Sequence, residues 1–470
     1  MKKLAVLFAI IMMHFSSHAQ NPASYIGTWA GVLNVGVELH IVFHFESPDG
    51  KTLKGKGDSP DQGAFGFPLD TVFVEGGKLT LRLQGVNASF TGELVNDSTM
   101  EGTFTQGADL PLTLKKTNQP VKKMERPQTP KAPFPYKAED VIYQNADKSV
   151  QFGATITIPE GQGPFPAVVM ITGSGTQNRD EEILGHKPFA VIADYLTRRG
   201  IIVLRVDDRG AGKTTGADST VTSADFAKDV SASVDYLLTR PEANKKRIGL
   251  VGHSEGGMIA PMVATARKDI SFIVLLAGPG VKITELMKGQ SMAIVRTSGI
   301  SEKAISAYGN LYESLTTIAI SDEADLQAAC LKTMKQWISN TDPEIVNEIG
   351  LGAEKDQVET VNLIVKEFSK PWFRYFLKFD PQPYLQKLKC KVLALNGDKD
   401  IQVIASQNIP GIEAALKKSK SPAYETHILP GLNHLFQHCK TCDVKEYGSL
   451  EETFSEDVLK MMAEWINTNG

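Results

Sequence analysis

The chain has few cysteines, no long apolar run after its first residues and no excess of basic side chains. Four cysteines in 470 residues are too few for disulfides to define the architecture. Beyond the amino-terminal segment, no apolar stretch approaches the ~20 residues that a membrane-spanning helix needs. The 50 basic residues do not exceed the 54 acidic ones, which argues against nucleic acid or an anionic membrane as partner. The sequence therefore predicts a protein without stable membrane insertion and with a small-molecule substrate.

Signatures of cofactors and metals are also missing. Residues 210–215 look superficially like a phosphate-binding loop, but the spacing G-x-x-x-x-G-K-[ST] is not met. A single Cys-x-x-Cys pair, Cys439 and Cys442, has no second pair or histidine cluster with which to hold zinc. We expect no metal and no cofactor. In an oxidising compartment this pair is expected to form a small local disulfide, with two free thiols as the alternative.

The first 19 residues have the pattern of a secretory signal. Lys2 and Lys3 precede an apolar run over 4–13, and small residues lead to an expected cleavage after Ala19. Its removal leaves 48 basic and 54 acidic residues, a net charge near −6. The sequence therefore predicts a secreted or periplasmic protein.

After this leader the chain contains four kinds of segment, which differ in their pattern of apolar and polar residues. Residues 20–117 alternate apolar and polar side chains in short runs between glycine and aspartate turns, which predicts a small all-β barrel or sandwich. Residues 118–135 hold five prolines and are expected to form an extended linker. Residues 136–281 and 379–470 alternate buried-strand patterns with helical ones, which predicts a doubly wound, mostly parallel α/β sheet. Residues 282–378 have only helical periodicity and are expected to form a helical cap over the ligand-binding edge.

The most informative motif is Gly-His-Ser-Glu-Gly at 252–256. It follows the apolar run 247–251 and precedes a helical pattern, which gives the order strand, G-x-S-x-G, helix. Two glycines allow a sharp turn that presents the Ser254 hydroxyl above the sheet edge, and the next helix points its amino terminus at the same place. Ser254 is therefore the predicted nucleophile.

A serine needs a base and an orienting acid, which in this topology follow it in the order acid, then histidine. Asp400 comes after the strand pattern 391–396, and Asp398 at the strand tip is the second choice. His434 comes after the strand pattern 424–429, and His438 is the alternative base. Two other histidines are expected to be structural, His427 within a strand and His253 beside the serine.

The chain resembles an α/β-hydrolase, and more narrowly the secreted bacterial serine carboxylesterases of the EstD type. The resemblance covers roughly 136–470 and rests on these segments: 173–175 with 178–180, 207–212, 252–256, 371–374, 396–400 and 433–437. It implies Ser254 as nucleophile, Asp400 as orienting acid and His434 as base. The His-Gly-Gly-Gly run of lipases is absent, so the backbone N–H that completes the oxyanion hole stays open.

These observations predict a serine esterase for short to medium acyl chains. Candidates for the oxyanion hole are the N–H of Glu255 and one from the loop around Ser174 and Gly175. The candidate substrate-binding residues are Trp372 and Phe373 of the cap. Three other cap residues, Met287, Met292 and Trp337, are further candidates for the pocket lining. The alternative for each of the five is that it belongs to the core of the cap. A peptidase, or a thioesterase or acyltransferase, with the same triad is the alternative. A binding module with a degenerate hydrolase domain is disfavoured by the complete triad.

Overall fold

The computed structural model describes residues 22–34, 38–62, 64–119 and 124–470. The expected signal segment, residues 1–19, lies outside the described residues. The chain divides into two compact units, residues 1–124 and 125–470. Among the described residues, no helix is long and apolar enough to cross a membrane.

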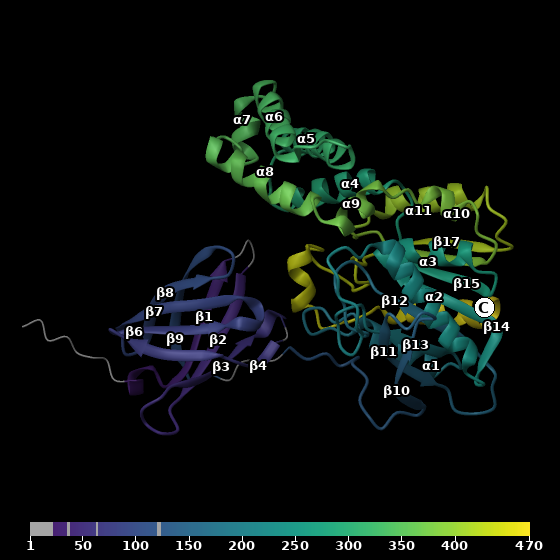
Figure 1. Cartoon of the computed structure of the whole chain (residues 1–470), viewed down its shortest axis with the longest axis horizontal. Coiled ribbons are helices and arrows are strands. Elements are labelled where there is room, and N and C mark those ends of the chain that lie inside the picture. Colours follow the sequence, from purple (N-terminus) through teal and green to yellow (C-terminus); the bar gives the residue numbers. More distant parts are fainter. Residues whose placement is uncertain (1–21, 35–37, 63, 120–123) are drawn as a thin grey trace, which may run out of the picture. The chain divides into compact units, whose positions relative to one another are not determined.

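The first unit is a single antiparallel sheet (Figure 1). The strands are β1 (Gly27–Asn34), β2 (Glu38–Glu46), β3 (Lys54–Ser59), β4 (Ala64–Pro68), β5 (Thr71–Glu75), β6 (Lys78–Leu83), β7 (Ala88–Asn96), β8 (Thr99–Thr105) and β9 (Asp109–Thr117). Their order is β4-β3-β2-β1-β9-β8-β7-β6-β5, so β9 returns to pair with β1. Alternate residues point to one face, where Trp29, Phe43 and Phe90 are fully buried. The predicted all-β domain is confirmed as a coiled sheet with edges at β4 and β5.

The second unit is built on an eight-stranded sheet in the order β10-β11-β13-β12-β14-β15-β16-β17. The strands are β10 (Lys137–Gln144), β11 (Gln151–Ile158), β12 (Phe165–Ile171), β13 (Ile202–Val206), β14 (Ala243–His253), β15 (Ile270–Leu276), β16 (Lys391–Gly397) and β17 (Tyr424–Leu429). β10 and β11 pair antiparallel, and from β13 onwards the neighbours are parallel. The predicted α/β class is confirmed.

Helices cover both faces of this sheet. They are α1 (Pro188–Thr197), α2 (Ser223–Thr239), α3 (Glu255–Ala266), α11 (Ala405–Leu416) and α12 (Glu456–Asn469), with the short α10 (Gln382–Leu385). Phe189 of α1 and Leu459 of α12 belong to one core cluster. Val234 of α2, Ile259 of α3 and Ile412 of α11 belong to the other. Because the central strands β12, β13, β15 and β16 are buried along almost their whole length, the middle of the sheet is enclosed between these two layers.

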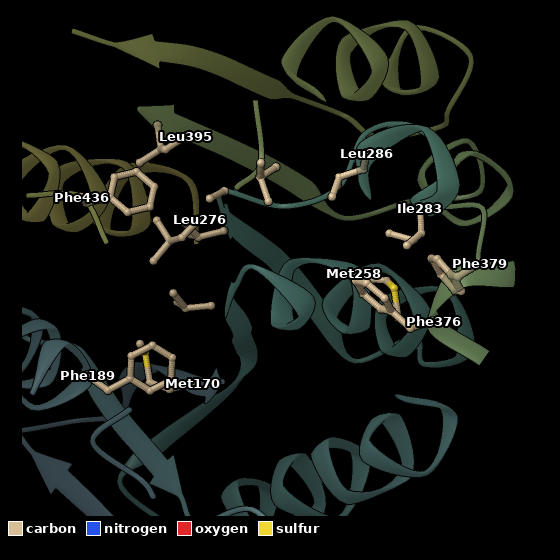
Figure 2. Packing of buried hydrophobic residues seen from close by; sticks show 14 of the residues in the cluster. Met170, Phe189, Met258, Leu276, Ile283, Leu286, Phe376, Phe379, Leu395 and Phe436 are labelled. Atoms are coloured by element: carbon tan, nitrogen blue, oxygen red, sulfur yellow. The ribbon is translucent and has the colours of Figure 1, made fainter. Parts of the chain in front are cut away.

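The insertion between β15 and α10 contains six helices among the described residues. They are α4 (Ile283–Arg296), α5 (Glu302–Ile320), α6 (Leu326–Ser339), α7 (Pro343–Glu348), α8 (Glu354–Phe368) and α9 (Pro371–Lys378). Figure 1 shows α4 and α9 nearest the sheet, with α5 to α8 farther out. Met258 of α3 shares a core cluster with Phe376 of α9, Ile283 and Phe379, and Figure 2 shows these side chains grouped together. The base of the insertion is thus anchored on the helix that follows Ser254.

The second half of the predicted linker 118–135 belongs to the second unit, which begins at Glu125. The Arg126 guanidinium donates to the carbonyl oxygens of Gly448, Leu450 and Leu184, at 2.7, 2.7 and 3.0 Å. The Gln128 amide exchanges hydrogen bonds with the backbone of 453–454. Proline content predicts an extended chain, but it carries no information about polar side chains that bind a distant carboxyl-terminal segment.

Candidate active site

Ser254 sits in the turn between β14 and α3 with backbone angles φ 52° and ψ −114°. A non-glycine residue at positive φ is strained, and such strain persists only where the surroundings enforce it. Here Ser254 N–H donates to Leu276 O at 2.8 Å. A Cβ at Gly252 would lie 2.1 Å from Gly256 O, and one at Gly256 would lie 2.2 Å from Ile171 O. Both glycines of the motif are therefore required by close backbone approach.

His434 and Asp400 form a buried pair beside this turn. His434 Nδ1 lies 2.8 Å from Asp400 Oδ2, and their side chains are 6% and 0% exposed. Asp400 Oδ1 accepts from the N–H groups of Gln402 and Val403, both at 2.8 Å. Asn396 Nδ2 donates to Asp400 Oδ2 at 3.0 Å. The carboxylate is thus fixed on both oxygens, and with it the orientation of the imidazole.

The competing candidates lie elsewhere. Asp398 Oδ1 accepts from Gly431 N–H at 2.6 Å, which ties the loop after β16 to the loop that carries His434. His438 is 59% exposed and pairs with Glu452 at 2.9 Å. His427 lies 3.3 Å from Glu425 on β17. Of the candidates, His434 and Asp400 are therefore the histidine and acid that pair with each other, while Asp398, His438 and His427 have other partners. The Cys439–Cys442 pair forms a disulfide in the loop after His434.

Ser254 and His434 line one cavity of about 290 Å³. Its other walls include Ser174, Glu255, Leu286, Met287, Phe376, Val403 and Leu435, with Trp372 and Phe373 from α9. Trp372 and Phe373 lie where the sequence predicts them, and so does Met287. Met292 and Trp337 do not line this cavity. Met292 Sδ would lie 2.5 Å from a Cβ at Gly309 of α5, and Trp337 packs inside the cap. The sequence did not distinguish these residues, because helical periodicity does not separate cap core from pocket wall.

Glu255, the residue after the serine, carries a buried carboxyl group. Ser223 Oγ donates to Glu255 Oε1 at 2.6 Å and Trp372 Nε1–H donates to it at 2.9 Å. Burial raises the pKa of Glu255, and hydrogen bonds from Ser223, Trp372 and Ser174 act in the opposite direction. The side chain thus joins α2, the cap and the 172–177 loop at the amino terminus of α3. The sequence offered Glu255 only for its backbone N–H.

A second histidine–acid pair, missed by sequence reasoning, lies next to His434. His253 Nδ1 lies 3.0 Å from Glu181 Oε1, and His253 Nε2 lies 3.0 Å from His434 O. Burial lowers the pKa of His253, but the Glu181 carboxylate and the two hydrogen bonds outweigh it and the pKa is raised. Glu181 Oε1 also accepts from Gly173 N–H at 2.6 Å. Gly173 N–H is therefore occupied, which leaves the N–H groups of Ser174 and Gly175 as loop candidates for the oxyanion hole.

The loop that carries these N–H groups is fixed by two adjacent acids. Asp207 binds Arg179 at 2.6 Å. Asp208 accepts from Thr172 Oγ1 and from Gln177 N–H, both at 2.8 Å. Burial raises the pKa of Asp208 to about 7 against the opposing effect of these two hydrogen bonds. The next residue, Arg209, pairs instead with Asp229 of α2 at 2.6 Å.

No group of three His, Cys, Asp or Glu side chains could hold a metal ion within the part of the chain that the structure describes. The polar groups around Ser254 are hydroxyl, imidazole, carboxylate and backbone N–H groups. Such a set is suited to nucleophilic attack on a carbonyl carbon.

This fold and this serine turn define an α/β-hydrolase. The chain belongs to the family described as serine aminopeptidase S33, whose profile matches residues 187–438, more than half of the chain. Esterase EstD of Thermotoga maritima is 36% identical over 135 residues, which are 29% of this chain and 32% of that protein. Acyl-coenzyme A thioesterase 3 of Mus musculus is 27% identical over 127 residues, which are 27% of this chain and 26% of that protein. The chain spans about a third or less of the length of the curated relatives it matches.

Solved structures show similarity at low identity. The Pyrococcus furiosus esterase Pf2001 has a TM-score of 0.44 and 16% identity, over 75% of this chain and 100% of that one. The proline iminopeptidase of Mycobacterium smegmatis has a TM-score of 0.42 and 14% identity, over 70% of this chain and 98% of that one.

Proposed function

We propose that the protein cleaves carboxylic esters through an acyl-enzyme, with Ser254 as nucleophile, His434 as base and Asp400 as orienting acid. The observation that carries the proposal is the convergence on one cavity of a strained serine and a buried His434–Asp400 pair. Because Asp400 accepts the proton of Nδ1, the lone pair of His434 Nε2 is left to accept the Ser254 proton.

In the first half-reaction Ser254 Oγ attacks the ester carbonyl while His434 takes its proton. The oxyanion forms at the amino terminus of α3, where the N–H of Glu255 and an N–H of Ser174 or Gly175 stabilise it. His434 then gives the proton to the departing alcohol, and an activated water releases the acid. Removing one oxyanion donor typically costs about a hundredfold or more in rate.

The lining of the cavity favours a neutral ester over a peptide with a free amino terminus. Two acids line the wall. Glu181 already binds His253 and Gly173, and Glu255 already binds Ser223 and Trp372. One oxygen of each carboxylate is thus engaged by groups of the protein, which makes both acids poorer partners for a substrate ammonium group. The described wall also contains no Lys or Arg side chain, which disfavours a coenzyme A thioester because its phosphates need cationic partners. Its apolar residues suit short to medium acyl chains.

A substrate panel tests the assignment. Nitrophenyl esters of increasing acyl length should be hydrolysed with a maximum at short to medium chains, whereas aminoacyl anilides and acyl-coenzyme A should be poor substrates. A kcat/KM for an aminoacyl anilide above that for the best ester would make the protein a peptidase. A preference for acyl-coenzyme A would make it a thioesterase.

A pair of variants tests the nucleophile. Ser254→Ala should lower kcat by orders of magnitude and abolish labelling by a fluorophosphonate. Ser314→Ala, which removes an exposed hydroxyl on α5, is the matched control and should behave as wild type. More than about a tenth of the wild-type turnover in Ser254→Ala would contradict the assignment.

We further propose that the chain is exported and processed after Ala19. The Lys2-Lys3 start with its apolar run, and the Cys439–Cys442 disulfide, both support an oxidising destination. Amino-terminal sequencing of the protein from the periplasm or medium should begin at Gln20, and a chain retained in the cytoplasm with Met1 intact would contradict export.

A further inference from the structure

The first unit contains a large cavity on the concave face of its sheet. Its volume is about 460 Å³, larger than the cavity that holds Ser254. Ligand pockets in proteins run from about 300 to 1,000 Å³. The other half of the same core is closely packed, since Trp29, Phe90, Met100 and Leu114 are all fully buried. Interiors normally leave few voids larger than a water molecule, so an opening of this size beside a well-packed core indicates a place for a ligand.

The floor of this cavity is apolar. Leu33 of β1, Ile41 and Phe43 of β2, Leu83 of β6 and Phe104 of β8 form it, and all five side chains are buried. Residues 39, 41 and 43 alternate along β2 and so point to the same face. The floor can therefore take a hydrocarbon tail, but offers little to a polar group.

The mouth is polar and almost uncharged. Its exposed members include Gln62, Asp70 and Gln106, with Gly85 and Val86 from the turn before β7. Asp70 Oδ2 already accepts from Gln84 N–H at 2.5 Å, and Gln106 Nε2 donates to Val86 O at 3.1 Å. Among the described lining residues, Asp70 is the single charged one and no Lys, Arg or His is present. An anionic head group would find no cation here and one carboxylate.

We propose that this cavity binds one neutral amphiphile, such as a fatty alcohol or an uncharged monoester. The tail lies against Phe43 and Phe104, and the hydroxyl or ester group lies at the amides of Gln62 and Gln106. A fatty acid carboxylate is rejected because it would be placed near Asp70 without a partner. The site is separate from the Ser254 cavity and contributes no catalytic group.

The test uses the full chain carrying Ser254→Ala, so that no ester is consumed. Phenylnaphthylamine, a neutral dye that brightens in apolar sites, is titrated to saturation and then displaced. Dodecanol, dodecanoate and dodecyltrimethylammonium share one tail and differ in head charge. We expect dodecanol to displace the dye at concentrations about tenfold or more below those of the two ions. Equal displacement by dodecanoate, tighter displacement by the cation, or no saturable dye binding would each overturn the proposal.

Two variants locate the bound dye. A Cβ at Gly85 meets no atom within 4 Å, so Gly85→Phe should obstruct the mouth without displacing a neighbour. Ala64→Phe on β4 narrows the same cavity from the opposite edge and covers the case in which Gly85→Phe does not fold. Val95→Phe, at an exposed position of β7 outside the cavity, is the matched control.

Both cavity variants should weaken dodecanol binding about tenfold or more, while the control should not. A diazirine derivative of dodecanol gives a readout that needs no variant, because it should label peptides within residues 33–106. Unchanged binding in both folded variants, or labelling confined to residues 125–470, would show that the ligand sits elsewhere and would overturn the site.

Discussion

Replacing Asp400 by asparagine should disable the base without removing it. Asp400 Oδ1 accepts from two backbone N–H groups, and Oδ2 faces both His434 Nδ1 and Asn396 Nδ2. The single carbonyl oxygen of an asparagine is best placed toward the two backbone N–H groups. Its NH2 then points at His434 Nδ1, which must become the acceptor.

In that arrangement the imidazole carries its proton on Nε2, toward Ser254, and cannot take the serine proton. A triad with the wrong tautomer loses about 10⁴ in kcat, which corresponds to ~5.4 kcal/mol of transition-state stabilisation. The folded state should lose less, because the amide is nearly isosteric with the carboxylate and the hydrogen bond that loses its acceptor is the one from Asn396 Nδ2.

The assay is kcat on a short nitrophenyl ester, with thermal unfolding measured on the same samples. Asp398→Asn is the matched control, since Asp398 lies two residues away, is 33% exposed at its side chain and binds only Gly431 and Lys399 among the described contacts. Its kcat should stay within about tenfold of wild type. Equal losses in the two variants, or a larger loss in Asp398→Asn, would refute this reading of the geometry and move the acid to Asp398.

Three further changes follow from the groups around Ser254, His434 and Asp400. Glu181→Gln keeps an oxygen for Gly173 and His253 but removes the negative charge that faces His253, so kcat should fall about tenfold or more and unfolding should cost ~1–3 kcal/mol less. Glu182→Gln on the surface should change neither, and an unaltered kcat in Glu181→Gln would show that the pair is not needed. Trp372→Ala enlarges the cavity and should raise kcat/KM for long acyl esters relative to short ones, which Trp337→Ala inside the cap should not do; an unchanged ratio would remove Trp372 from the acyl site. Asp208→Asn should raise Tm by about 2–4 °C near pH 9 and little near pH 4. The pKa of Asp208 is raised to about 7 in the folded protein, so this carboxyl lowers stability only at pH values above its pKa in the unfolded chain. An equal shift in Tm at both pH values would contradict a titrating Asp208.

Sequence reasoning reached the parts of the site that local chemistry determines. Ser254 was identified because two glycines with a strand and a helix around them require a particular turn, and the structure shows the close backbone contacts behind that requirement. Asp400 and His434 follow strands of a parallel sheet, whose carboxyl ends share one edge. Their meeting could thus be expected from chain order alone, and their catalytic roles remain predictions.

The parts of the site that the sequence did not predict depend on contacts between distant segments. Glu181 lies 72 residues before His253 in the chain, and no local pattern marks it as the partner of a buried histidine. The Glu255 side chain accepts a hydrogen bond from Trp372, which lies 117 residues later in the chain, in the last helix of the cap. Periodicity also located the cap without separating Met287, which lines the cavity, from Met292, which packs between cap helices. Contacts of this kind depend on tertiary packing, which cannot be read from any short stretch of the sequence.

The Arg126 and Gln128 contacts change where the catalytic unit begins. These side chains satisfy carbonyl and N–H groups in the segment 448–454, and Tyr447, one residue before it, lines the Ser254 cavity. A truncation that starts at Tyr136, after the last linker proline, would remove both side chains and leave those backbone groups without their partners. Its inactivity would then say nothing about the β domain. A fragment that starts at Glu125 keeps this brace, so the minimal hydrolase is longer at its amino end than its α/β fold alone requires.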